Sequence, residues 1–244
     1  MIGIFDSGIG GLSLYKKAKK AMSDKTFIYL ADQDSFPYGE KSEKELRALT
    51  RKNIKLLENL GAKVVLIACN SATVSSRDRI RREFDIPLVG VEPAVKVVHD
   101  LYSNKKALVL ATDRTSRSHL KNKAASYGNV KIIGANGLVS LIEEKFPNIQ
   151  ASELKNILDN KIDGEEVIVL GCTHYHLIQK ILESIYPDKI FIAPEEAVIK
   201  QLSKFSDLAT GSGADDIFLT TGDLAGFQVK LEAIIGRKCD VRKI

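Results

Sequence analysis

The chain has 244 residues, 44% of them hydrophobic and 27% charged, a composition that excludes a disordered or fibrous protein. Its net charge is +5, and the basic residues are scattered and densest toward the ends of predicted helices, so the charge gives no strong signal of nucleic-acid binding. No apolar run approaches the ~20 residues of a membrane span, and the N-terminus lacks the features of a secretion signal.

Short apolar, β-rich segments alternate with longer amphipathic segments along most of the chain. In chain order we predict strands at 2–5, 26–30, 63–68, 87–91, 107–111, 130–133, 166–170 and 189–192. Helices are predicted near 11–22, 42–60, 72–83, 116–126, 152–160 and 174–185. Continuous apolar strands that alternate with helices are typical of parallel sheets covered by helices on both faces, so we predict an α/β fold.

Two segments in different halves of the chain share one plan. Residues 64–71 and 167–174 each run from an apolar strand through a small residue to a cysteine, and a polar residue then opens a helix. Upstream, strand 2–5 leads into Asp6 and strand 107–111 leads into Thr112. Any two α/β units share some of this pattern, but both cysteines fall where open α/β sheets place their ligand sites. The halves therefore look like two versions of one layout.

The cysteines are the residues best suited to chemistry. An odd number of three argues against a disulfide framework and favours a reducing cytoplasm with free thiols. Cys69 and Cys172 each follow a strand at the first turn of a helix, where the helix dipole favours the thiolate and lowers the pKa of the thiol. Either one alone could equally be a small buried hydrophobe. Cys239, in the basic tail, has no such partner and is expected to be idle.

Four uses of two facing thiols compete. A redox pair usually has a local C-x-x-C, which is absent, and a zinc site would need more ligands than Cys69, Cys172 and His174 provide. A Cys–His hydrolase would leave one cysteine unexplained. The fourth use is a pair of acid/base groups on opposite faces of one carbon, one removing a proton and the other returning it. This use involves both thiols and their symmetry.

The glycine-rich opening at residues 6–11 resembles a nucleotide-binding loop only superficially, and the sequence favours another role. A dinucleotide fingerprint needs glycine at position 13, where this chain has Ser13, and the lysine and hydroxyl of a Walker motif are missing. The glycines are expected to let the backbone approach a small ligand or the next helix closely. Asp6 and Ser7 have an alternative role as helix caps, and His174 as a capping or packing residue.

Together these residues resemble the cofactor-independent glutamate racemases of the aspartate/glutamate racemase superfamily. The matching segments run in family order across nearly the whole chain: Ile4-Phe5-Asp6-Ser7-Gly8-Ile9-Gly10-Gly11, Pro37-Tyr38-Gly39, Ala68-Cys69-Asn70-Ser71-Ala72, Glu92-Pro93, Ala111-Thr112 with Thr115 and Ser118, Gly171-Cys172-Thr173-His174-Tyr175, and Thr220-Thr221-Gly222-Asp223. The two cysteine motifs and the opening glycine motif are specific in combination, and the other segments support them.

The resemblance implies two similar three-layer α/β domains with parallel sheets and an active site in the cleft between them. It implies that L- and D-glutamate interconvert without pyridoxal phosphate or metal, supplying D-glutamate for peptidoglycan. Cys69 and Cys172 would be the acid/base pair, assisted by Asp6 and His174. The amino acid would be held by Ser7, Tyr38, Gly39, Asn70, Ser71, Thr112, Thr115 and Thr173. Glu143 aligns loosely with a family carboxylate near the second cysteine, and a homodimer is expected.

The repeated pattern of strand, cysteine and helix at residues 64–71 and 167–174, together with the resemblance, gives the expected domain boundaries. One lobe takes residues 1–92 and the tail 206–244, and carries Cys69. The other takes residues 93–205 and carries Cys172. The chain would cross between the lobes near Glu92-Pro93 and again near residues 201–206, and motion of the lobes would open and close the cleft.

The chain departs from the family pattern at five places. Ser71 stands where threonine is usual, no arginine precedes Pro37-Tyr38-Gly39, and Ala135 replaces a common cysteine. His176 stands where proline usually follows the Gly-Cys-Thr-His-Tyr motif, and Ala193-Pro194-Glu195 replaces an Asp-Ser pair that is common after the late strand. None removes a catalytic group, so they bear on substrate preference more than on reaction type. The alternatives are a racemase of aspartate or another acidic amino acid, and a non-catalytic relative that binds a partner such as DNA gyrase.

Overall fold

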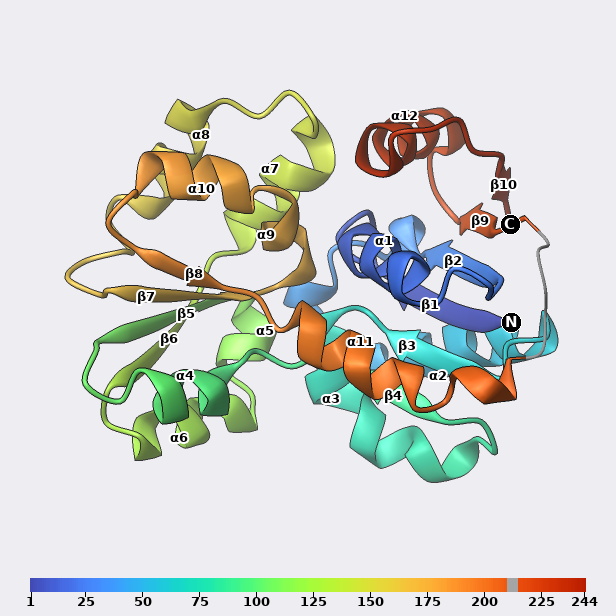
Figure 1. Ribbon diagram of the computed structural model, residues 1–244, viewed down its shortest axis with the longest axis horizontal. Coiled ribbons are helices and arrows are strands. Elements are labelled where there is room, and N and C mark those ends of the chain that lie inside the picture. The colour runs from blue at the N-terminus through green and yellow to red at the C-terminus, as the bar shows by residue number, and fades with distance from the viewer. Residues whose placement is uncertain (210–214) are drawn as a thin grey trace.

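The computed structural model describes residues 1–209 and 215–244 and contains two parallel sheets (Figure 1). The first has the strand order β10-β9-β2-β1-β3-β4 and the second β6-β5-β7-β8. The strands of the first sheet are β1 (Ile2–Asp6), β2 (Phe27–Ala31), β3 (Val64–Ile67), β4 (Leu88–Gly90), β9 (Ile217–Thr220) and β10 (Val241–Lys243). Those of the second are β5 (Ala107–Ala111), β6 (Val130–Gly134), β7 (Val167–Gly171) and β8 (Ile190–Ile192).

The two sheets repeat one topology. The order β2-β1-β3-β4 in the first is matched strand for strand by β6-β5-β7-β8 in the second. The register brings the ends of the central strands level, with Phe5 opposite Ile67 and Leu110 opposite Leu170. The repeated layout predicted from the sequence is therefore present, and so is the predicted fold class of two similar α/β units with parallel sheets.

Helices cover both faces of each sheet, which is why the central strands are apolar except for Asp6 at the end of β1. Every residue of β1, β2, β5 and β7 is buried. The helices are α1 (Leu12–Ala21), α2 (Glu43–Asn59), α3 (Asn70–Ile80), α4 (Val95–Leu101), α5 (Asp113–Ser116), α6 (His119–Ser126), α7 (Asn136–Lys145), α8 (Ala151–Leu158), α9 (Thr173–Leu177), α10 (Gln179–Ile185), α11 (Glu195–Ser203) and α12 (Leu224–Ile235). Within the described ranges, none of them is both long enough and apolar enough to cross a bilayer.

All eight predicted strands are present, each within one residue of its expected ends. Two predicted helices are wrong because the structure has a pair of shorter helices in place of each one. The helix expected at 116–126 is interrupted at Ser118, whose extended backbone and side-chain hydroxyl cap α6. The helix expected at 174–185 is interrupted at Ile178. There α9 buries four consecutive residues, a pattern that no amphipathic surface helix shows.

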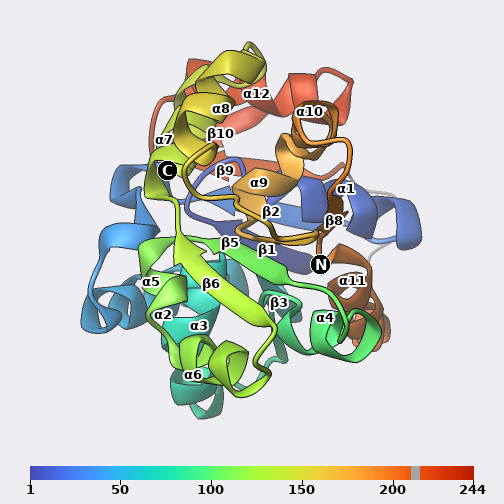
Figure 2. The same ribbon diagram turned by 90° about the vertical axis from the view of Figure 1, so that its left-hand side faces the viewer.

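Helix α11 lies with the first sheet, although it follows β8 of the second. It packs against α1 and β4, and Figure 1 shows it running beside these elements. Seen from the side, α4 and α6 lie below the second sheet and α8 and α10 above it (Figure 2). The chain thus leaves the second sheet after β8 and before α11. Within the expected tail 206–244, residues 210–214 lie outside the described residues.

Candidate functional site

Cys69 and Cys172 occupy equivalent positions in the two halves. Cys69 follows β3 and is the N-cap of α3, and Cys172 follows β7 and is the N-cap of α9. Both cysteines have extended backbone, and their residues are only 6% and 5% exposed. The carboxyl ends of two corresponding central strands therefore each deliver one buried thiol to the helix that follows.

Asp6 and Ser7 stand beside the first thiol. The Ser7 hydroxyl lies 3.9 Å from Cys69 Sγ and donates to Asp6 Oδ1 at 3.4 Å. Asp6 also accepts the Gly8 N–H at 2.8 Å and, from the other half of the molecule, the Thr173 hydroxyl at 3.0 Å. Burial raises the pKa of Asp6 to about 6, because desolvation of the carboxylate outweighs the opposing effects of His174 and these hydrogen bonds.

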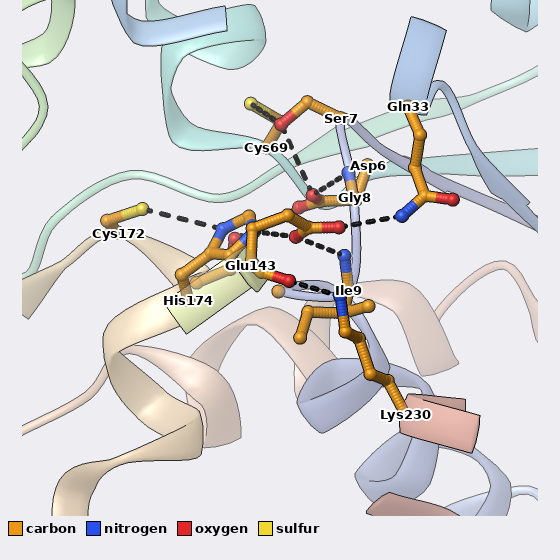
Figure 3. A network of polar contacts seen from close by, with 12 residues as sticks. Asp6, Ser7, Gly8, Ile9, Gln33, Cys69, Glu143, Cys172, His174 and Lys230 are labelled. Carbon is orange, nitrogen blue, oxygen red and sulfur yellow. Dashed lines mark hydrogen bonds and ion pairs between the residues drawn. The ribbon is translucent and has the colours of Figure 1, made fainter. Parts of the chain in front are cut away.

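His174 and Glu143 stand beside the second thiol, as Figure 3 shows. His174 Nδ1 lies 3.9 Å from Cys172 Sγ, and His174 Nε2 lies 2.7 Å from Glu143 Oε2. Burial alone would lower the pKa of His174, but its contacts with Cys172, Glu143 and Asp6 outweigh burial and raise that pKa well above the usual value. The imidazole is therefore held as a cation beside Cys172.

Glu143 is fixed by several donors. Its carboxylate accepts the Ile9 N–H at 3.0 Å and the Gln33 side-chain amide at 2.8 Å, in addition to its contact with His174. Burial favours a raised pKa for Glu143, but these hydrogen bonds outweigh it and lower the pKa. Lys230 of α12 donates to the backbone carbonyl of the same residue (Figure 3).

The expected lowering of the thiol pKa by the helix N-terminus is wrong for Cys69. Burial, followed by the negative charge of Asp6, raises the pKa of Cys69 well above its usual value. The Ala72 N–H and the Ser7 hydroxyl oppose this effect without overcoming it. Cys69 is therefore a neutral thiol in this arrangement, because desolvation in a closed site outweighs the field of one helix end.

The glycine loop makes room for the other half of the molecule. A Cβ atom on Gly8 would overlap the Glu143 carboxylate, and one on Gly10 would overlap the ring of His174. The sequence led us to expect close approach to a ligand or to the next helix. The structure shows that side chains of α7 and α9 fill this space, so these two glycines bring the loop after β1 against the second half.

Hydroxyl and amide groups extend the site on both sides. Ser71 Oγ and Thr112 Oγ1 lie 2.8 Å apart and join the two halves, and Thr112 donates to Thr115 Oγ1 at 3.1 Å. Asn70 donates to the Val91 carbonyl at 3.2 Å, and its buried Oδ1 accepts from no group in the described ranges. That oxygen is an unused acceptor at the first residue of α3.

The Tyr38 hydroxyl is occupied within its own half. It donates to Asp32 Oδ2 at 2.5 Å, and Asn53 donates to both groups at 3.0 Å. Gly39 lies against the second half, since a Cβ there would stand 2.9 Å from Thr112 Cβ. Sequence reasoning missed Asp32, Asn53 and Gln33. The position of Asp32, directly after a buried strand, is the same signal that singled out Asp6.

A cavity of about 370 Å³ adjoins Gly39. Residues of both halves line it, among them Ser42, Asp113, Arg114 and Asn136. In residues 1–209 and 215–244, no group of three or more His, Cys, Asp or Glu side chains is arranged to hold a metal ion.

Comparison with known proteins identifies the family. The sequence model of the Asp/Glu/Hydantoin racemase family matches residues 2–202. The chain belongs to this family. A glutamate racemase of Clostridium perfringens strain SM101 is 37% identical over 214 residues, which cover 83% of this chain and 82% of the relative. A glutamate racemase of Fusobacterium nucleatum is 31% identical over 256 aligned positions, which cover 100% of this chain and 97% of the relative.

Solved structures of this family share the whole fold. Escherichia coli glutamate racemase, in complex with L-glutamate and the activator UDP-MurNAc-Ala, has a TM-score of 0.87 and 28% identity, covering 100% of this chain and 97% of that one. Glutamate racemase of Francisella tularensis in complex with D-glutamate has a TM-score of 0.82 and 26% identity, covering 100% and 96%. The two-domain fold predicted from the sequence is thereby confirmed.

Proposed function

We propose that the chain is a glutamate racemase that interconverts L- and D-glutamate with Cys69 and Cys172 as its two acid/base groups. The observation that carries this proposal is the pair of buried thiols at equivalent strand ends, each with its own polar partner. The relatives named above support glutamate as the substrate. The activity requires an α-carbon proton to leave on one face and a proton to arrive on the other.

The geometry supports a two-base sequence. One cysteine, as thiolate, takes the α-proton, so that an S–H bond forms and the C–H electron pair stays on carbon. The other cysteine, as thiol, gives its proton to the opposite face and becomes the thiolate. Asp6, through Ser7, serves the Cys69 side, and the His174 cation serves the Cys172 side. After one turnover the protonation states of the two thiols are exchanged, ready for the reverse direction.

Groups around the thiols are suited to holding an acidic amino acid. We assign substrate binding to Ser7, Tyr38, Gly39, Asn70, Ser71, Thr112, Thr115 and Thr173. The unused acceptor of Asn70 suits the α-ammonium group, and the hydroxyls and helix N-termini suit the carboxylates as charge builds on the carbanion. Tyr38 contributes through its ring and backbone, because its hydroxyl already donates to Asp32. Glu143 orients the His174 imidazole and stabilises its positive charge.

The lobe boundaries belong to the same proposal. We place the first crossing near Glu92-Pro93, as the sequence indicated. The packing of α11 against α1 and β4 favours a second crossing at residues 193–194, earlier than the expected 201–206. Because both thiols are buried, the lobes must separate to admit substrate, and the cavity beside Gly39 is the entrance we propose. A homodimer and a role in peptidoglycan synthesis follow from the family resemblance, and a cytoplasmic location follows from the odd number of free thiols. Sedimentation analysis tests the homodimer.

Incubation of the purified chain with L-glutamate in D2O, without added cofactor, tests the activity. We expect optical rotation to vanish while deuterium enters the α-position in the NMR spectrum. Cys69→Ala and Cys172→Ala should each abolish racemisation with the fold retained, whereas Cys239→Ala should match the unchanged chain. Full activity in either single variant would end the two-cysteine account. Faster exchange with aspartate than with glutamate would instead assign the chain to the other acidic substrate.

A further inference from the structure

Two of the departures from the family pattern lie against each other. His176 stands on α9, two residues beyond His174, and Glu195 is the first residue of α11. Their side chains are 1% and 7% exposed, and His176 Nδ1 lies 3.3 Å from Glu195 Oε1. The contact is an ion pair without the alignment of a hydrogen bond. Such a buried contact requires an explanation, because burying a charged carboxylate is costly unless it is paired.

Both ring nitrogens of His176 face acceptors. Nε2 lies 3.2 Å from the carbonyl oxygen of Leu170, two residues before Cys172, and Nδ1 faces the Glu195 carboxylate. The Leu170 carbonyl and the ionised Glu195 carboxylate are both acceptors, so each suits a ring N–H of His176 as its partner. His176 therefore ties the end of β7 to the start of α11.

Glu195 extends the link to the first half. Its Oε2 lies 2.6 Å from Nζ of Lys17 on α1. Burial favours a raised pKa for Glu195, but His176 and then Lys17 outweigh it and lower the pKa to about 2. α1 follows the glycine loop that carries Asp6, and α9 begins directly after Cys172. The chain Lys17–Glu195–His176 thus joins the helices behind two of the loops that build the proposed site, and α1 packs against both α9 and α11.

We propose that His176 and Glu195 are positioning residues that hold Cys172 at its working distance from the loop after β1. This inference rests on the proposed racemase activity. His174 and His176 anchor α9 on two sides, one to Glu143 and the other to Leu170 and Glu195. Loss of the Glu195 charge weakens its contacts with His176 and Lys17, and we expect α9 to shift and Cys172 to move with it. Proton transfer is sensitive to displacements of this kind.

Directional isotope effects separate positioning from general stability. We would measure kcat, KM and the deuterium isotope effect with α-deuterated L-glutamate and α-deuterated D-glutamate, for the unchanged chain and for Glu195→Gln. A misplaced Cys172 slows only the steps in which Cys172 moves the proton. The isotope effect should therefore rise for the enantiomer whose proton Cys172 removes and fall for the other. We expect kcat to drop fivefold or more and KM to change less than twofold.

Matched variants complete the test. Glu195→Asp keeps the charge and should recover part of kcat, while Glu83→Gln, which breaks the exposed Arg51–Glu83 pair, should leave both isotope effects unchanged. If circular dichroism shows that Glu195→Gln does not fold, Lys17→Gln replaces it. This variant should raise the same isotope effect and lower the other, each by a smaller amount. A fall in kcat that only follows the folded fraction, with both isotope effects unchanged, would overturn the positioning role. An unchanged chain that does not exchange the α-proton would refute the proposed function itself.

Discussion

The Asp6 carboxyl group receives three donors and is still harder to ionise than an ordinary carboxyl group. Ser7, Gly8 and Thr173 all donate to it, yet burial raises its pKa to about 6. The opposite balance holds at Glu143, where the contact with His174 and two further donors outweigh burial. The site therefore holds two buried carboxyl groups whose different surroundings move their pKa values apart, a pattern expected of acid/base machinery.

Replacement of Asp6 by asparagine should stabilise the protein at high pH and impair catalysis. The folded pKa lies above the unfolded value of 3.8, so the stability that Asp6 contributes is fully present below that value and is lost as pH rises through about 6. Asp6→Asn removes this dependence. Relative to the unchanged chain, its free energy of unfolding should rise by about 2.5 kcal/mol between pH 4 and pH 8. Urea titrations check this, and kcat should fall about 100-fold or more. A pH-independent difference would contradict the shifted pKa.

Gly8→Ala should damage the site without unfolding the protein. The added methyl group would displace the Glu143 carboxylate and separate it from His174. We expect kcat to fall by a factor of about 10 or more, with the cost mainly in catalysis because the displaced group is the end of a side chain. Gly137→Ala is the matched control, since a Cβ at Gly137 on α7 meets nothing within 4 Å and alanine favours a helix. Equal activity of the two variants would argue against a role for Glu143.

At the scale of elements, helix α2 begins with a capping box directly after the Tyr38-Gly39 segment. Ser42 accepts the Glu45 N–H, and the Glu45 side chain accepts the Ser42 N–H. Ser42→Ala should lower the free energy of unfolding by about 1 kcal/mol. Glu45→Gln keeps a side chain that can complete the box and should cost less. Thermal unfolding of both variants checks the order, and a more damaging Glu45→Gln would show that charge rather than capping matters here.

The strands were predictable because their burial on both faces makes them continuous apolar runs. In the part of the chain that the structure describes, four helices and two strands were not predicted: α4, α7, α11, α12, β9 and β10. Helix α4 contains Val95, Val97 and Val98 and resembles a strand locally, while β10 is a three-residue edge strand with two exposed positions. Glu143 could be reached only through the family resemblance, because the helix that carries it, α7, was not predicted. The link between Glu143 and Ile9 joins residues 134 positions apart, and no local pattern encodes such a contact.

Across the whole molecule, the lobe motion that we propose would make the reactivity of the thiols a measure of opening. Cys69 and Cys172 follow the corresponding strands β3 and β7, whereas Cys239 lies in the tail with a similar exposed fraction of 7%. Saturating glutamate should slow the alkylation of Cys69 and Cys172 by iodoacetamide at least tenfold and leave Cys239 unchanged, as peptide mass spectrometry would show. Because its pKa is raised, Cys69 should react faster as pH increases. Protection of all three thiols alike would indicate global stabilisation instead.

The pairing of β2 with β9 has a consequence for synthesis on the ribosome. Ile28 lies opposite Ile217, so the first sheet stays incomplete until almost the entire polypeptide has been made. The four strands of the second sheet all lie within residues 107–192 and emerge as one continuous stretch. The second sheet is thus free to fold first, while the first sheet keeps an unpaired edge at β2 until β9 has been made. Nascent chains released near residue 200 would carry one finished domain and one exposed template for aggregation.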